Sequence, residues 1–162
     1  MVMTECGAGK VGLKHELFLK ELTQDLIPFI EKKYRVKKDR QYRAMAGLSM
    51  GSMQASMLGF GHRELFAWMG LFSGFMRNEM GTNGDNRHLE ILLENREEFL
   101  KGNRLLFRCM GREGVFWDRF ERDDQFCQEH HIPCTRKVYS GGHDWNVWRQ
   151  AAGEFLPLLF RE

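Results

Sequence analysis

Hydrophobic residues near the start of the chain recur at helical spacing. They lie three or four positions apart, at Leu17, Phe18, Leu22, Leu26, Ile27 and Ile30. This spacing predicts an amphipathic helix over residues 15–34. Pro28 falls inside the pattern and is expected to kink the helix or to start a new turn, because proline has no N–H to donate. We expect residues 1–14 to form a loop-like segment and residues 15–162 to form a single domain.

Four short apolar runs follow, and each of them leads into a helical pattern. The predicted strands are residues 42–48, 65–72, 104–110 and 135–139. The predicted helices are residues 50–59, 88–100, 115–131 and 146–160, with a polar loop over 77–86. The run 65–72 is continuously apolar, which is typical of a buried strand in a parallel sheet. The alternation therefore predicts an α/β fold, with a parallel sheet of about four strands flanked by helices.

The composition is that of an ordinary globular protein, with 43% hydrophobic and 28% charged residues in 162 positions. The net charge of +2 gives no electrostatic basis for binding nucleic acid or an anionic membrane surface. No apolar stretch is long enough to cross a bilayer. The first ten residues lack the apolar centre of a signal peptide, so a cytoplasmic location is the default expectation.

One motif of possible catalytic function lies between a predicted strand and a predicted helix. Gly47-Leu48-Ser49-Met50-Gly51 matches the pattern G-x-S-x-G. A nucleophile elbow requires this strand–turn–helix context, since small flanking residues permit a strained serine backbone. Ser49 is therefore the candidate nucleophile, and the backbone amide of Met50 is the candidate oxyanion donor. A glycine-rich turn without a catalytic role is the alternative.

A second motif, Ser140-Gly141-Gly142-His143-Asp144, lies between the last predicted strand and the last predicted helix. A catalytic histidine must reach the serine from a loop, and paired glycines allow the sharp turn that this requires. The order along the chain, serine before histidine, is that of α/β-hydrolases. Asp144 is expected to cap the next helix, because a residue adjacent to His143 is poorly placed to bond the same ring.

A further cluster consists of Cys127, His130, His131 and Cys134. One interpretation of this cluster is a zinc site, and the other is an ordinary helix terminus. These residues fall at the end of a predicted helix that runs into Pro133, and no further pair of ligands occurs elsewhere. An ordinary helix terminus is therefore favoured over zinc. We expect no metal and no organic cofactor.

Two segments resemble one known family. The segment 18–51, which contains the first helix and the elbow, resembles the esterase family of the α/β-hydrolase fold. That family includes feruloyl and acetyl-xylan esterases of carbohydrate esterase family one, and enterochelin-esterase-like proteins. The segment SGGHDWNVW over residues 140–148 resembles the family's histidine loop, particularly that of feruloyl esterases. The resemblance covers the chain from about residue 15 onwards and corresponds to the C-terminal part of the family's domain.

The resemblance implies a serine carboxylic-ester hydrolase that acts through an acyl-enzyme, on feruloyl or acetyl esters of sugars or polysaccharide. It assigns Ser49 as the nucleophile and His143 as the base. In similar proteins the third catalytic residue is an Asp three positions after a strand-end glycine, where this chain has Gly114. Glu113, one position earlier, is therefore the candidate acid; the alternatives are Asp118 and the absence of a catalytic acid.

Members of the family carry several strands before the first helix found here, and a loop in that half supplies a second oxyanion donor. Losing such a donor costs about a hundred- to a thousandfold in turnover. The resemblance therefore leaves an alternative function open, in which a truncated, non-catalytic or weakly active fragment serves as a binding or assembly module.

The predicted strand 42–48 would lack its neighbour on one side. An exposed apolar strand edge favours pairing with another chain. We therefore expect the isolated chain to be poorly soluble, or to form a homo-oligomer or bind a companion chain. A monodisperse monomer in analytical ultracentrifugation would contradict this expectation.

Overall fold

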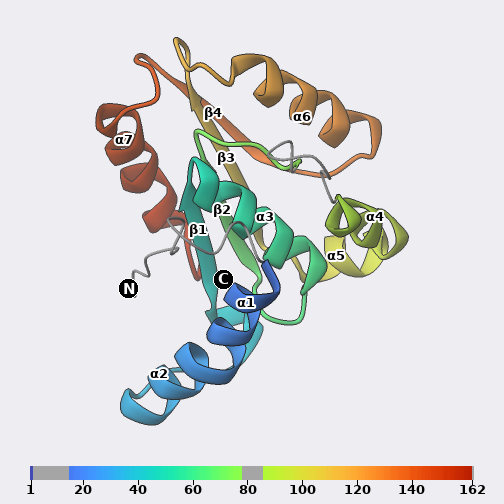
Figure 1. The fold of residues 1–162 in the computed structure, drawn as a ribbon, viewed down its shortest axis with the longest axis vertical. Helices are drawn as coiled ribbons and strands as arrows, with labels where there is room; N and C mark the ends of the chain where they lie inside the picture. Colours follow the sequence, from blue (N-terminus) through green and yellow to red (C-terminus); the bar gives the residue numbers. More distant parts are fainter. Residues whose placement is uncertain (2–14, 78–85, 162) are drawn as a thin grey trace. The chain divides into compact units, whose positions relative to one another are not determined.

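The computed structural model describes residue 1, residues 15–77 and residues 86–161 (Figure 1). The chain divides into two compact units, Met1–Lys38 and Asp39–Glu162. Apart from Met1, the expected loop over residues 1–14 lies outside the described residues. Most of the polar loop expected over residues 77–86 also lies outside them.

The first unit is helical in three consecutive segments. These are α1 (His15–Lys20), the π-helical segment η1 (Glu21–Leu26) and α2 (Ile27–Lys33). The predicted helix is therefore confirmed, and its irregularity lies directly before the proline. Pro28 occupies the first turn of α2, where a missing N–H is best tolerated. The change from α-helical to π-helical hydrogen bonding in η1 is expected before Pro28, because Pro28 cannot donate to a carbonyl in the preceding turn.

The second unit is built on a four-stranded parallel sheet. Its strands are β1 (Ala44–Leu48), β2 (Trp68–Phe72), β3 (Leu105–Gly111) and β4 (Thr135–Tyr139), in the spatial order β1-β2-β3-β4. β2 is buried at every position, as its continuous apolar run predicts. β1 is an edge of this described sheet, and its residues Ala46 and Leu48 are exposed. The expected oligomer stays a prediction.

Five α-helices of the second unit are described. They are α3 (Met50–Gly61), α4 (Arg87–Glu94), α5 (Arg96–Gly102), α6 (Trp117–Glu129) and α7 (Trp145–Phe155). Short 3-10 turns, η2 (Arg40–Tyr42) and η3 (Leu156–Leu158), lie near its two ends. The single helix predicted over residues 88–100 is interrupted at Asn95, whose side chain donates to the Ile91 carbonyl at 2.9 Å. Within the described ranges, no helix is both long and apolar enough to span a membrane.

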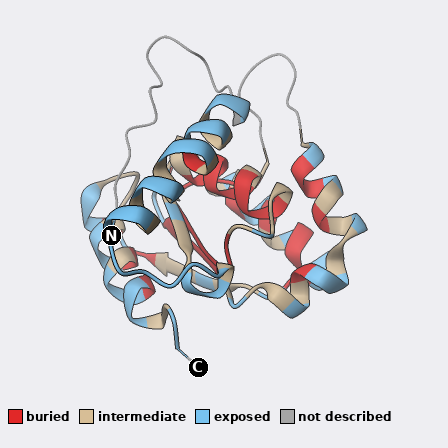
Figure 2. Cartoon of the chain, turned by 90° about the horizontal axis from the view of Figure 1, so that it is seen from below, coloured by how far each residue is buried: buried red, intermediate tan, exposed pale blue. Residues whose placement is uncertain are grey.

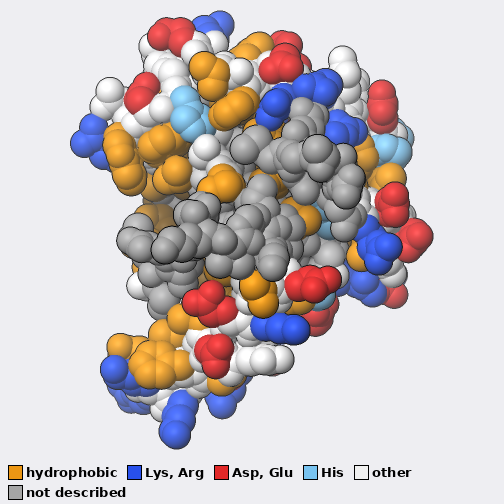
Figure 3. Space-filling view, in the orientation of Figure 1, with side chains coloured by type: hydrophobic (Ala, Val, Ile, Leu, Met, Phe, Trp, Pro, Cys, Tyr) orange, Lys and Arg blue, Asp and Glu red, His pale blue; other side chains and the backbone are white. Residues whose placement is uncertain are grey.

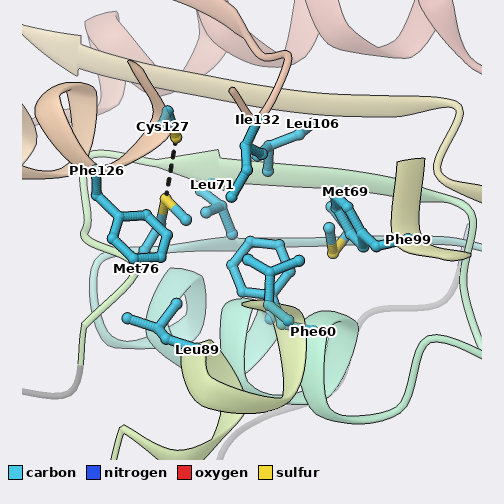
Figure 4. Packing of buried hydrophobic residues seen from close by; sticks show 12 residues of the cluster. Phe60, Met69, Leu71, Met76, Leu89, Phe99, Leu106, Phe126, Cys127 and Ile132 are labelled. Atoms are coloured by element: carbon cyan, nitrogen blue, oxygen red, sulfur yellow. Dashed lines mark hydrogen bonds between the residues drawn. The ribbon is translucent and has the colours of Figure 1, made fainter. Parts of the chain in front are cut away.

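Helices cover both faces of the sheet, and buried positions concentrate on the surfaces between them (Figures 1 and 2). On one face, side chains of α3, α4, α5 and α6 pack against Met69, Leu71 and Leu106 (Figure 4). On the other face, α7 packs against Phe72 and Phe107. Neighbouring strand residues thus point to opposite faces, as the pleat requires. Each large apolar side chain buried in this way contributes about 1.5–3 kcal/mol. The predicted α/β fold is confirmed.

The parallel register brings the carboxyl ends of the strands to one edge of the sheet. Leu48 pairs with Phe72, Phe72 with Cys109, and Gly111 with Tyr139. Ser49 directly follows the first of these ends, and the His143 loop follows the last. In open parallel sheets the carboxyl ends of the strands are where binding and catalytic residues collect.

Candidate active site

Ser49 lies in a strained turn between β1 and α3. Its backbone angles are φ 54° and ψ −120°, which cost a non-glycine residue on the order of 1–3 kcal/mol. The Ser49 N–H donates to the Phe72 carbonyl at 2.9 Å and so attaches the turn to the end of β2. A Cβ atom at position 47 would overlap the Gly51 carbonyl, so the turn requires glycine there. The sequence G-x-S-x-G therefore adopts the geometry of a nucleophile elbow.

Ser52 supports this turn from inside the protein. It is fully buried, and its hydroxyl donates to the Ser49 carbonyl at 2.7 Å. Gly74, after β2, approaches so closely that a Cβ atom there would overlap the Ser52 hydroxyl. Ser52 therefore stabilises the turn that carries Ser49, a role that the sequence alone did not indicate.

The histidine loop brings the imidazole of His143 to the elbow. His143 Nε2 lies 3.0 Å from Ser49 Oγ, within hydrogen-bond distance. Gly141 has φ 115°, a conformation that side chains disfavour, and its carbonyl accepts from the Glu113 N–H at 3.0 Å. The loop is thus attached to the turn that follows β3, and its glycines allow the close approach.

Two aromatic rings hold the imidazole edge-on. The Phe116 ring centroid lies 5.3 Å from that of His143, with an interplanar angle of 85°. The Trp148 ring lies 5.1 Å away at 90°. Burial between these rings lowers the pKa of His143 below its ordinary value of 6.5, and the nearby charge of Asp144 opposes that shift. The neutral imidazole is therefore the dominant form at pH 7, which is the form that accepts a proton.

The structure does not bring either candidate acid to His143. The backbone N–H of Glu113 donates to the Gly141 carbonyl in the histidine loop, whereas the Glu113 side chain is exposed to solvent. Asp118 is also exposed and pairs with Arg122 at 3.1 Å. Among the residues that the structure describes, His143 Nδ1 is buried and has no hydrogen-bond partner.

Asp144 caps α7, as its position in the sequence predicts. Its carboxylate accepts from the N–H groups of Asn146 at 2.8 Å and Val147 at 3.4 Å. It also accepts from the Gly142 N–H at 2.9 Å, and these bonds, led by that of Gly142, lower the pKa of Asp144. All of its contacts stabilise the loop and the helix start, so Asp144 fixes the path of the histidine loop.

Met50 opens α3 directly after the candidate nucleophile. Backbone N–H groups in the first turn of a helix have no acceptor within the helix and carry a partial positive charge. The Met50 amide therefore suits a developing oxyanion next to Ser49, and this role stays a proposal.

The cluster Cys127, His130, His131 and Cys134 does not form a recognisable zinc site in the structure. No three His, Cys, Asp or Glu side chains converge on a possible metal position within the described part of the chain.

Some hydrophobic side chains next to this site are exposed. Figure 3 shows hydrophobic side chains in the region of α7 and in several other places on the same face. Trp145, at the start of α7, is 62% exposed and contacts Trp148, which in turn contacts His143. Val115, in the loop before α6, is 75% exposed. The site is therefore bordered by an aromatic, weakly polar surface that can pack against an apolar acyl group.

The parallel sheet flanked by helices is the α/β-hydrolase class of fold, in which a serine in a strand–turn–helix typically lies beside a histidine from the last strand-end loop. The comparison with known families agrees: the chain matches the family described as Putative esterase over residues 7–133. This chain belongs to that esterase family.

Several of the proteins that this chain is similar to are named as feruloyl or ferulic acid esterases. An endo-1,4-beta-xylanase/feruloyl esterase of Xylanibacter ruminicola is 46% identical over 67 residues, which are 41% of this chain and 9% of that protein. A solved ferulic acid esterase is 30% identical, with a TM-score of 0.73, over 86% of this chain and 59% of its own. A ferulic acid esterase of Anaeromyces mucronatus in complex with ferulic acid is 20% identical, with a TM-score of 0.73, over 88% of this chain and 54% of its own. A structural similarity at 20% sequence identity shows a shared fold only. The chain thus spans less than two thirds of the length of these relatives.

Proposed function

We propose that this chain is a serine carboxylic-ester hydrolase that acts through an acyl-enzyme. The observation that carries the proposal is the 3.0 Å contact between His143 Nε2 and Ser49 Oγ, made by a serine in the strained elbow conformation. A neutral imidazole whose Nε2 accepts this bond carries its proton on Nδ1. The lowered pKa of His143 keeps that neutral form available at pH 7. Membership of an esterase family supports the same chemistry.

In the first half of the reaction, Ser49 Oγ attacks the ester carbonyl while His143 Nε2 takes the hydroxyl proton. The Met50 amide donates to the oxyanion of the tetrahedral intermediate. His143 then gives its proton to the departing alcohol, which leaves an acyl group on Ser49. In the second half, water loses a proton to His143, attacks the acyl carbonyl and releases the acid, so that Ser49 is regenerated.

His143 works here without a carboxylate on Nδ1 in the described part of the chain. Phe116 and Trp148 can fix the ring orientation by packing, but aromatic edges stabilise an imidazolium much less than a carboxylate does. Spoiling the acid of a catalytic triad costs about four orders of magnitude in rate. We therefore expect this chain to turn over esters slowly and to favour activated leaving groups.

The proposed substrates are feruloyl or acetyl esters of sugars or polysaccharide. The names of the relatives support the feruloyl group, and the exposed Trp145 beside the site suits stacking against an aryl acyl group. The test is to measure ferulate release from a feruloylated oligosaccharide and acetate release from an acetylated one. Release of either by the wild-type chain, but not by Ser49→Ala, supports the proposal, and release of neither contradicts it. The non-catalytic alternative is not favoured, because the chain retains the Ser49–His143 pair.

Neither candidate acid should matter for activity. Glu113→Gln and Asp118→Asn are each expected to change kcat/KM for an activated ester by less than about twofold, because both side chains are exposed and neither contacts His143. Initial-rate kinetics on the purified variants would check this. A loss of about a hundredfold or more in either variant would identify that residue as the acid and contradict the geometry described above.

The pH dependence of kcat/KM should report His143. Protonation of Nε2 removes the base, so activity should fall as the pH drops through the pKa of His143. Because burial lowers that pKa, the midpoint should lie below 6.5. Asp144→Asn should move the midpoint to still lower pH, since the carboxylate that raises the pKa is lost while asparagine can still cap α7. A midpoint above 6.5, or a shift to higher pH in the variant, would contradict this assignment.

A further inference from the structure

Two cysteines meet at the connection between α6 and β4, away from the Ser49 elbow in the sequence. Cys127 lies in the last turn of α6, and Cys134 directly precedes β4. The turn between them is closed by the Ile132 N–H, which donates to the Cys127 carbonyl at 2.8 Å. The sulfur atoms of Cys127 and Cys134 both contact the same nitrogen of Arg108, Nη1. Cys127 and Cys134 therefore form a neighbouring thiol pair.

A buried cation lies beside both sulfur atoms. Arg108, in β3, is 1% exposed, and its Nη1 lies 3.9 Å from Cys127 Sγ and 4.0 Å from Cys134 Sγ. The same guanidinium group contacts Asp124 at 2.8 Å, Asp123 at 3.9 Å and the Phe120 carbonyl at 3.0 Å. A fixed positive charge at this distance favours a thiolate over a thiol. It also disfavours a metal cation at the same place.

The two thiols differ in their surroundings. The neighbouring Cys127 thiol lowers the pKa of Cys134, and the Arg108 charge lowers it as well, although burial acts in the opposite direction. Cys134 is only half-buried, so a small reagent can reach it. Cys127 is buried in the core, where its thiol donates to Met76 Sδ at 3.7 Å (Figure 4). The neighbouring Cys134 and burial both raise the pKa of Cys127. Cys134 is therefore the thiol of the pair that ionises more readily.

A third cysteine shows what an ordinary buried thiol looks like in this fold. Cys109, in β3, is fully buried among the residues that pack against α7. Burial raises its pKa to about 12. It therefore offers no thiolate near neutral pH and serves as an internal reference for the reactivity of the other two.

We propose that Cys127 and Cys134 form a redox-active dithiol that a low-molecular-weight disulfide converts to an intramolecular disulfide. The Cys134 thiolate attacks one sulfur of the external disulfide, whose S–S bond breaks and releases one thiolate. The Cys127 thiol then loses its proton to that thiolate and attacks Cys134 Sγ, which expels the second thiolate. Two electrons pass from the cysteines to the external disulfide, which leaves as two small thiols after uptake of a proton from solvent. This proposal is independent of the esterase reaction.

The test uses the folded full chain and glutathione disulfide as the oxidant. Free thiols are blocked with N-ethylmaleimide after the reaction, and the cysteine peptides are mapped by mass spectrometry. We expect the segment that contains Cys127 and Cys134 to weigh two hydrogens less than its reduced form and to carry no maleimide, while Cys109 reacts with maleimide only after denaturation. Recovery of both cysteines as free thiols would overturn the proposal. So would a mixed glutathione disulfide on Cys134 that persists in the wild-type chain.

Matched variants separate the two roles. Cys127→Ser should accumulate the mixed disulfide on Cys134, because no second thiol displaces the glutathione. Cys134→Ser should leave Cys127 unmodified in the folded chain, and Cys109→Ser should not affect the cross-link. The wild-type mapping decides the proposal by itself, so it stays testable if one of the variants fails to fold.

Discussion

Ser49→Ala should lower kcat/KM for ester hydrolysis by about a thousandfold or more, because no acyl-enzyme can form without the hydroxyl. His143→Ala should lower it to a similar level, since the hydroxyl at 3.0 Å then has no base. Removing both groups should cost little more than removing one, because the two act as a unit. Steady-state kinetics with an activated aryl ester would measure all three variants.

Ser140→Ala is the matched control for this prediction. Ser140 lies in the same histidine loop but has an exposed side chain. It should retain activity within about twofold, as expected for a surface position. A Ser49→Ala variant that keeps most of the wild-type activity would contradict the proposed nucleophile, whereas equal losses in His143→Ala and Ser140→Ala would point to damage to the histidine loop.

Arg108→Met should lower the free energy of unfolding by about 3–5 kcal/mol, the usual cost of removing one partner from a buried ion pair. The side chain is 1% exposed and joins β3 to α6 through Asp123, Asp124 and the Phe120 carbonyl. Asp123 is itself 1% exposed, so its charge would remain buried with fewer partners. Urea unfolding followed by circular dichroism would measure the loss.

Arg122→Ala tests whether burial decides the size of this effect. Arg122 also pairs with an aspartate, Asp118 at 3.1 Å, but its side chain is 48% exposed. Exposed pairs of this kind contribute about 0.2–1 kcal/mol, so the variant should be close to the wild type. Equal losses in the two variants would contradict the account of Arg108 as the centre of a buried network.

Periodicity was sufficient to predict the architecture. The continuous apolar run that became β2 and the helical patterns between strands are local signals, and they determine a parallel sheet once right-handed connections are assumed. The break at Asn95 was not predicted, because the apolar spacing continues across it, from Leu92 to Phe99. The break depends on a side-chain hydrogen bond to the Ile91 carbonyl that no periodicity reveals.

Residues of the candidate site could be predicted only where they belong to a contiguous sequence motif. Ser49 and His143 each stand in a glycine-containing turn at a strand end, so the motif itself carries the position. The candidate acid was chosen by its distance from Gly111 along the chain. Such a distance does not give the direction of a side chain, so the sequence did not reveal that Glu113 is exposed to solvent. The buried network of Arg108 could not be predicted for a related reason, because its partners lie 12 or more residues away, on α6.

The most direct test of the central claim is to map the product of a fluorophosphonate probe on the folded chain by peptide mass spectrometry. We expect a single phosphonylated residue, Ser49, and loss of that product in His143→Ala, because only a serine activated by a base reacts with such probes. A folded wild-type chain that remains unlabelled, or that carries the label on another residue, would contradict the assignment of Ser49 and His143 as the reacting pair.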